Sequence, residues 1–227
     1  MLRIVPHVTQ ELESMVRKKT RKAKRSPWNK GREVGQRDPF SRSDVSRIRK
    51  QLTKRGDAGL RDLALFSTAI DTMLRTPDLL ALTVTDVRKR NRTMRDTIDL
   101  PEASSGRRLR CTLSKATTRI LAKWIDTSGK KTHDFLFTGR IGGGRKAINA
   151  RQLSRLVKAW AEGIGLDASA YGIESLRRTR SIYILNRTGN MEAARILLGL
   201  TDIGTTARYL SDSKPIDALA ISRAHEI

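Results

Sequence analysis

Most of the chain after residue 40 carries apolar residues at helical spacing. In the segment 41–56, Val45, Ile48 and Leu52 recur at intervals of three and four residues, which predicts a helix with one buried face. Residues 60–74 carry a broader apolar face, which is typical of a well-buried helix. The same spacing predicts helices at 117–125, 149–164, 175–189 and 190–200, and a short helix that Pro77 opens.

Residues 95–113 follow a different pattern. Apolar and polar positions alternate on both sides of Ser104, Ser105 and Gly106, which predicts two short strands joined by a turn. No repeat period runs along the chain, so the pattern does not favour a solenoid. The sequence therefore predicts a mainly α fold with a small antiparallel β-sheet, in the α+β class.

The first 40 residues differ from the rest in charge. Seven basic residues fall within nine positions: Arg17, Lys18, Lys19, Arg21, Lys22, Lys24 and Arg25. This run is either a solvated tail or an arm that follows a phosphate backbone. Since like charges side by side give an isolated helix little support, we favour a basic, partly flexible arm at 1–40. We expect one folded domain at 41–214 and a separate tail at 215–227.

The composition narrows the class of partner. The 227 residues include 46 Lys and Arg against 23 Asp and Glu, a net charge of +23, which favours nucleic acid first and an anionic membrane surface second. No apolar run approaches the roughly 20 residues of a membrane span, and the start lacks a secretory segment. Cys111 is the single cysteine and the three histidines are scattered, which argues against a disulfide framework and a metal site. We therefore expect a cytoplasmic protein without a membrane partner.

Three segments form a pattern when taken together: TAIDTMLRTPDLLAL, YGIESLRRTRSIYILNRTGN and ARILLGLTDIGTTARYL. They resemble, in that order, the sequence boxes of the tyrosine recombinase, or phage integrase, family. The resemblance extends from residue 31 to residue 219 and is strongest to short bacterial members with little beyond the catalytic domain. It implies the catalytic-domain fold of that family, double-stranded DNA as the partner, and a mobile genetic element as the setting.

The resemblance also implies a role for each matched residue. Tyr209 falls on the nucleophile, Arg75 and Arg177 on the two catalytic arginines, and Asp78 on a supporting acidic position. Members of the family attack a DNA phosphodiester with the tyrosine, form a 3′-phosphotyrosyl bond, and use no metal or nucleotide cofactor. Two guanidinium groups suit this chemistry, because each can bind phosphoryl oxygens bidentately.

Three positions depart from the family pattern. Ser104 stands where a lysine is usual, Glu174 where the second box has a histidine or lysine, and Leu200 where the last histidine or tryptophan is usual. A carboxylate beside a scissile phosphate repels it. We therefore expect Glu174 to form an ion pair with Arg177 or Arg75 that closes the phosphate clamp in the absence of DNA.

Three further arginines are candidates for contacts with DNA. Arg107 and Arg108 follow the predicted turn between the strands. Arg178 lies beside Arg177, and we expect it to face solvent or the DNA backbone. All three add to the positive charge expected around the site.

Two functions remain open from the sequence. One is a site-specific recombinase that acts in DNA integration; the other is a catalytically impaired relative that binds DNA as an accessory factor or regulator. An unrelated RNA-binding protein explains the charge but not the three ordered boxes. The family also implies assembly on DNA as a homo-oligomer. The apolar residues Ile216, Leu219 and Ile221 of the tail can dock on a neighbouring copy or fold back on their own core.

Overall fold

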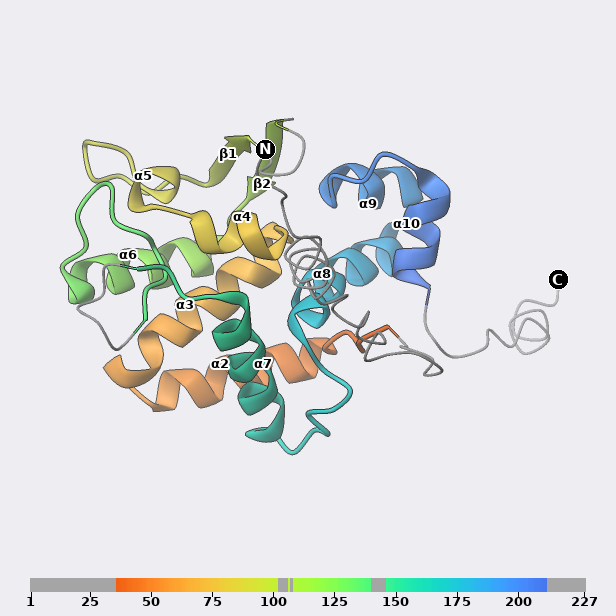
Figure 1. The fold of residues 1–227 in the computed structure, drawn as a ribbon, viewed down its shortest axis with the longest axis horizontal. Coiled ribbons are helices and arrows are strands. Elements are labelled where there is room, and N and C mark those ends of the chain that lie inside the picture. The colour runs from red at the N-terminus through yellow and green to blue at the C-terminus, as the bar shows by residue number, and fades with distance from the viewer. Residues whose placement is uncertain (1–35, 102–105, 107, 140–145, 212–227) are drawn as a thin grey trace, which may run out of the picture. The chain divides into compact units, whose positions relative to one another are not determined.

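The computed structural model describes residues 36–101, 106, 108–139 and 146–211 (Figure 1). These residues belong to one compact unit that begins at Gln36. The predicted basic arm with its run at 17–25, the positions Ser104 and Arg107, and the tail at 215–227 lie outside the described residues. None of the described helices combines the length and apolar character that crossing a bilayer requires.

Helices dominate the described part of the chain, and one pair of strands completes it. The helices are α2 (Arg42–Lys54), α3 (Asp57–Thr72), α4 (Thr76–Ala81), α5 (Val84–Val87), α6 (Lys115–Ser128), α7 (Ala150–Glu162), α8 (Ile173–Thr188), α9 (Met191–Leu197) and α10 (Ile203–Leu210). The strands are β1 (Thr97–Pro101) and β2 (Arg108–Thr112), which pair antiparallel. The mainly helical α+β fold predicted from the apolar spacing is thus confirmed.

Side chains at the helix starts explain where two of these helices begin. The Ser41 hydroxyl accepts a hydrogen bond from the backbone N–H of Asp44, and the Asp44 carboxylate accepts one from the N–H of Ser41, both at 3.1 Å. Asn149 and Gln152 make the same reciprocal pair at the start of α7. Such capping boxes satisfy backbone donors that the first helical turn leaves unpaired.

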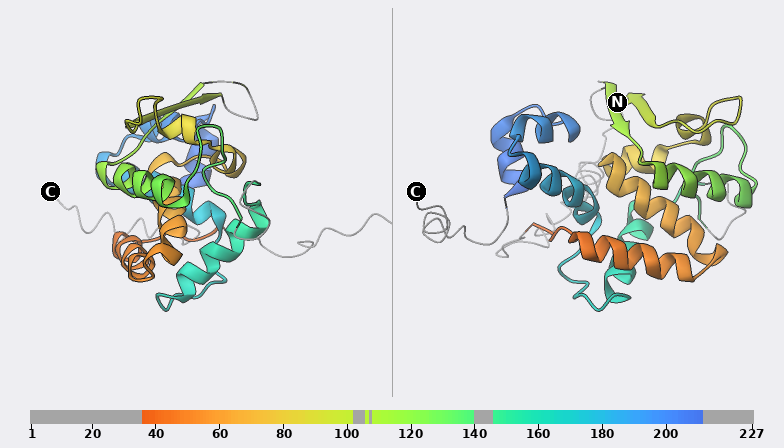
Figure 2. Two further views of the ribbon diagram at one scale, coloured as in Figure 1. Left: turned by 90° about the vertical axis from the view of Figure 1, so that its left-hand side faces the viewer. Right: turned by 180° about the vertical axis from the view of Figure 1, so that it is seen from behind.

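Helix α3 forms the centre of the body. It packs against α2, α6 and α8, and Figure 2 shows it between α2 and α6. Every residue from Gly59 to Thr72 is buried. Phe66 of α3 meets Trp160 of α7 edge to face, with the ring centroids 5.4 Å apart. The predicted broad apolar face therefore serves as the centre of the core.

A smaller apolar cluster joins the end of α3 to the last helices. Met73, Ala194, Leu198 and Leu210 are buried in it. Met73 adopts a left-handed backbone conformation with a φ of 52°, which ends α3 and turns the chain toward α4. This cluster brings α9 and α10 next to a turn that lies far away in sequence.

Residues 36–40 pack onto the folded body. The N–H of Asp38 donates to the carbonyl of Ala170 at 3.0 Å, and the Phe40 ring stacks on Tyr171 with centroids 4.6 Å apart. Phe40 is only 3% exposed. The boundary predicted at residue 40 therefore falls inside the packed part of the chain, because the buried Phe40 ring precedes the first capped helix.

The two strands lie beside α5 and α3. Ile98 faces Cys111 across the pair, and both side chains are buried. The Arg108 guanidinium pairs with the Asp99 carboxylate at 2.9 Å on the exposed face. The strand pair predicted from alternation is present, and Gly106 of its connecting turn has a φ of 67°.

Candidate active site

Two helices supply the core of the site. Near its first turn α8 carries Glu174 and Arg177, which are three residues apart and therefore share one face of the helix. Near its end α10 carries Tyr209. Because α8, α9 and α10 pack together around the smaller apolar cluster, residues that are 35 positions apart meet in space.

Tyr209 and Glu174 are in direct contact. The Tyr209 hydroxyl donates a hydrogen bond to Oε2 of Glu174 at 2.7 Å. The Glu174 side chain is exposed, whereas the tyrosine is partly buried. The guanidinium carbon of Arg177 lies 5.5 Å from the centroid of the Tyr209 ring, within the range of a cation–π interaction. The phenol therefore sits between a carboxylate and a guanidinium.

These surroundings change the acidity of the phenol. Burial raises the pKa of Tyr209 well above its ordinary value, and the negative charge of Glu174 raises it further. The positive charges of Arg177 and Arg178 oppose part of this increase. Tyr209 is therefore a neutral phenol near neutral pH, and it needs a proton acceptor before it can act as a nucleophile.

Arg177 links two distant backbone segments. Its Nε donates to the carbonyl of Met73 at 2.9 Å, and its Nη2 donates to the carbonyl of Leu198. The residue is 9% exposed. Within the described residues, Nη1 has no hydrogen-bond partner, and no ion pair joins Arg177 to Glu174. Of the two predicted partners of Glu174, Arg177 is therefore wrong: the carboxylate instead receives the Tyr209 hydroxyl, and backbone carbonyls hold the guanidinium. The alternative pair with Arg75 stays a prediction.

Arg75 stands at the N-cap position of α4, half-buried. Together with Arg177 it lines a small hollow whose other walls include Cys111 and Leu198. Asp78 follows in the first turn of α4 and is 5% exposed. A carboxylate there stabilises the positive end of the helix dipole. The structure thus places both arginines at one hollow and Arg177 against Tyr209.

Leu200 follows α9 and belongs to the smaller apolar cluster together with Tyr209. The backbone N–H of Leu200 donates to the carbonyl of Arg195 at 3.0 Å, after Gly199 turns the chain with a φ of 62°. A leucine side chain cannot donate a hydrogen bond to a phosphate. At this position the chain therefore packs against Tyr209 of α10 and offers no polar side chain.

The structure corrects the expectation for Arg178. Its side chain is 2% exposed, and its guanidinium donates to the carbonyls of Arg37 and, at 2.9 Å, Ser211. It ties the segment before α2 to the end of α10, so it does not face solvent, and its contact with DNA stays a prediction. Arg108, by contrast, has a 70% exposed side chain and is available at the surface, although it is paired with Asp99.

The sequence analysis treated Cys111 only as the single cysteine, and the structure places it near the site. It is 7% exposed and lines the hollow that Arg75 and Arg177 share. Burial, followed by the negative charges of Asp78 and Asp99, raises its pKa to about 11, although Arg180 opposes the increase. The neighbouring arginines therefore do not make it a reactive thiolate. Among the described residues, no group of three or more His, Cys, Asp or Glu side chains is placed to hold a metal ion.

Native Cys111 is expected to resist alkylation. At about pH 8 nearly all of a thiol with this raised pKa is protonated, and the thiolate is the reacting species. Mass spectrometry after iodoacetamide treatment should find the folded protein largely unmodified and the urea-unfolded protein fully modified. Equal rates in both states would show that the thiol is exposed or activated in the folded protein.

Comparisons with known proteins agree with one another. Residues 38–215 match the phage integrase family. The chain is 27% identical over 151 residues to tyrosine recombinase XerC from Xanthomonas axonopodis pv. citri (strain 306), a match that covers 66% of this chain and 47% of that protein. The chain therefore spans about half the length of this curated relative.

Solved structures show the same fold. A XerA recombinase aligns with a TM-score of 0.65 at 18% identity, over 86% of this chain and 66% of that one. A XerH recombinase bound to its difH substrate in a pre-cleavage complex aligns with a TM-score of 0.63 at 16% identity, over 83% of this chain and 54% of that one. A lambda integrase dimer bound to a COC′ core site aligns with a TM-score of 0.57 at 14% identity, over 82% of this chain and 51% of that one.

Proposed function

The chain belongs to the phage integrase family, and we propose that it cuts and rejoins double-stranded DNA at specific sites with Tyr209 as the nucleophile. One observation carries this proposal. The Tyr209 hydroxyl donates to Glu174 at 2.7 Å while the Arg177 guanidinium lies 5.5 Å from its ring centroid. The groups proposed as nucleophile, proton acceptor and phosphate-binding cation therefore lie next to one another.

The proposed cleavage step accounts for every proton. The Tyr209 oxygen attacks the scissile phosphorus, and its proton passes to the Glu174 carboxylate as the new P–O bond forms. The bond to the 5′-oxygen breaks, and that oxygen leaves with the electron pair and takes a proton from a water molecule, whose hydroxide passes into the bulk solvent. The product is a 3′-phosphotyrosyl bond and a free 5′-hydroxyl. Rejoining runs the same steps in reverse and returns the proton from Glu174 to Tyr209.

The two arginines would stabilise charge on the phosphoryl oxygens. Two backbone carbonyls hold Nε and Nη2 of Arg177, so Nη1 is the nitrogen that would donate to a phosphate oxygen. Arg75 lines the same hollow. Donors that are already in place where charge develops contribute strongly to catalysis, because no reorganisation is needed during the reaction.

A second function is supported by a specific feature of the site. Glu174 is an exposed carboxylate where the scissile phosphate would approach, and Leu200 adds no hydrogen-bond donor there. A protein with these residues and an inactive Tyr209 would bind DNA without cutting it and would act as an accessory factor or regulator. The same experiment separates the two functions.

The test is capture of a covalent intermediate on nicked duplexes drawn from a randomised pool. After cleavage the short strand beyond the nick diffuses away, so rejoining is blocked and the adduct accumulates. We expect a protein–DNA adduct whose phosphotyrosyl peptide contains Tyr209 and which is absent in Tyr209→Phe. Tyr183→Phe is the matched control, because Tyr183 is a partly exposed tyrosine that contacts Arg42 instead of Glu174. DNA binding without an adduct would overturn the cleavage function and favour the accessory role.

A further inference from the structure

A basic hollow lies away from the Tyr209 site. It is formed by the turn between α5 and β1 and by the end of α6, and has a volume of about 580 Å³. Its lining includes six basic residues, Arg88, Lys89, Arg90, Arg92, Lys130 and Lys131, and one acidic residue, Asp126. None of these residues lines the hollow that Arg75 and Arg177 share. The proposed chemistry makes no use of this cluster.

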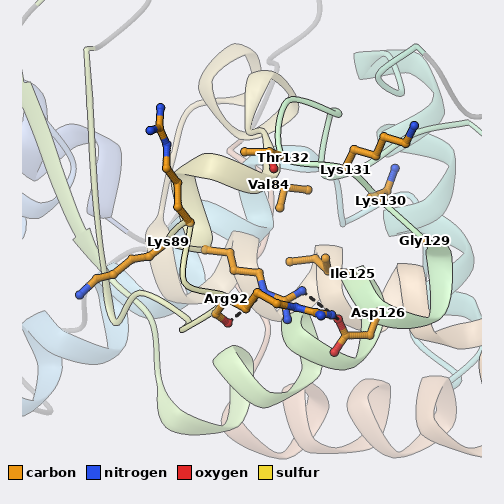
Figure 3. Close-up of a pocket in the computed structure, with 11 residues that line it drawn as sticks. Val84, Lys89, Arg92, Ile125, Asp126, Gly129, Lys130, Lys131 and Thr132 are labelled. Carbon is orange, nitrogen blue, oxygen red and sulfur yellow. Dashed lines mark hydrogen bonds and ion pairs between the residues drawn. The ribbon is translucent and has the colours of Figure 1, made fainter.

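The single acidic side chain in this hollow is already paired. Oδ1 of Asp126 lies 2.8 Å from Nη1 of Arg88 and 3.7 Å from Nη2 of Arg92. Figure 3 shows Arg92 meeting Asp126, with Lys89 and Lys131 on opposite sides of the view. Among the described residues, Lys89 and Lys131 form no ion pair, and the same holds for Arg90 and Lys130. Four cations of the hollow are therefore left without a bound carboxylate.

Lys130 is held inside the wall of the hollow. Its Nζ donates to the Thr138 hydroxyl at 3.0 Å and lies 5.6 Å from the centroid of the Trp124 ring. Burial lowers its pKa, and the charge of Asp134 opposes this only in part. A cation that has lost part of its hydration gains more from a nearby anion than a fully solvated one does.

The turn that presents the other cations is closed by its own backbone. The N–H of Lys89 donates to the carbonyl of Thr93, and the N–H of Arg92 donates to the carbonyl of Lys89, both at 2.9 Å. Arg92 adopts a left-handed conformation with a φ of 67°, which a side chain other than glycine adopts only at a cost in strain. The cations are thus presented by a folded turn, and binding an anion there requires little ordering of the backbone.

We infer that this basic hollow binds the sugar–phosphate backbone of duplex DNA at a place separate from the Tyr209 site. The inference rests on the proposed function in taking the same DNA as ligand. An open hollow with several unpaired cations suits a row of phosphates better than a single small anion, because each phosphate needs its own counter-charge.

The test compares how salt weakens DNA binding in two charge-matched variants. The first removes three cations of the hollow (Lys89→Gln, Arg90→Gln and Lys131→Gln). The control removes three exposed cations of α2 and its C-cap (Lys50→Gln, Lys54→Gln and Arg55→Gln). A duplex of about three helical turns serves as the probe. Each lost phosphate contact is expected to reduce the log–log salt slope by about 0.9. When the salt is raised from about 50 to 200 mM, the affinity of wild type should fall by a factor about 40 times larger than the affinity of the first variant.

The outcomes separate this inference from the proposed cleavage. The inference would be overturned if the first variant kept the wild-type salt slope of DNA binding. It would also be overturned if the salt slope fell equally in both variants. A loss of affinity for single-stranded RNA of equal charge, with duplex affinity unchanged, would do the same. If the first variant alone changes the slope while wild type forms no covalent adduct, the second site stands and the cleavage function fails.

Discussion

Glu174→Gln is expected to lower the rate of strand cleavage by about 10²–10⁴ while increasing affinity for duplex DNA. The amide has the shape of the carboxylate and can still accept the hydrogen bond from Tyr209, but it cannot take the proton. Removing a negative charge beside the phosphate position also removes a repulsion, so binding and catalysis should change in opposite directions. Adduct formation on nicked DNA in a single turnover measures the rate, and a filter-binding titration measures the affinity.

The pH dependence of the variant gives a second readout. Because burial and the charge of Glu174 both raise the pKa of Tyr209, little phenolate exists near neutral pH. Without a carboxylate to accept the proton, cleavage needs that phenolate, whose fraction rises about tenfold per pH unit below the pKa. The rate of Glu174→Gln should therefore increase with pH more steeply than the wild-type rate. Glu174→His, which supplies another proton acceptor, should recover part of the lost activity.

A matched control is Glu192→Gln on α9. Glu192 is exposed like Glu174, but it pairs with Arg195 at 2.5 Å and does not touch Tyr209. Its removal should leave the cleavage rate and pH dependence unchanged. If Glu174→Gln cleaves as fast as wild type with the same pH profile, then Glu174 is not the proton acceptor and its contact with Tyr209 is only structural.

Most elements of the fold were predictable because their information is local, although α10 (Ile203–Leu210) was not among the predicted helices. Ser41 and Asn149 mark helix starts through hydrogen bonds to residues three positions away. Apolar spacing alone also indicated that the segment of α3 is buried on most sides. The packing of residues 36–40 was not predictable in this way, because Phe40 is held by Tyr171 and Thr179, more than 130 residues away.

The site shows the same division between local and distant information. The predicted helix at 175–189 begins one residue after Glu174, whereas α8 begins at Ile173 and therefore carries both Glu174 and Arg177. The partner of Glu174 was not predictable from the sequence either. That partner depends on how α10 docks against α8, which the smaller apolar cluster decides. Likewise, the sequence does not distinguish the adjacent Arg177 and Arg178. Arg178 is buried because the segment before α2 and the end of α10 cover it.

Arg178→Met is expected to destabilise the fold without changing how salt weakens DNA binding. The methionine fills the space of the aliphatic stem, but it cannot donate to the carbonyls of Arg37 and Ser211. Each hydrogen bond to a charged group contributes about 1.5–3 kcal/mol, so losing both should cost about 3 kcal/mol or more. For a body of this size the melting temperature should fall by roughly 6–12 °C.

Arg108→Met is the control for this prediction, because Arg108 is exposed and faces solvent from β2. It should change the melting temperature far less, and it should flatten the salt slope if it contacts a phosphate. The opposite result for Arg178→Met, a nearly unchanged melting temperature with a salt slope reduced by about one, would place Arg178 on DNA. The segment at 36–40 and the end of α10 would then have to separate when DNA binds, because Arg178 now joins them.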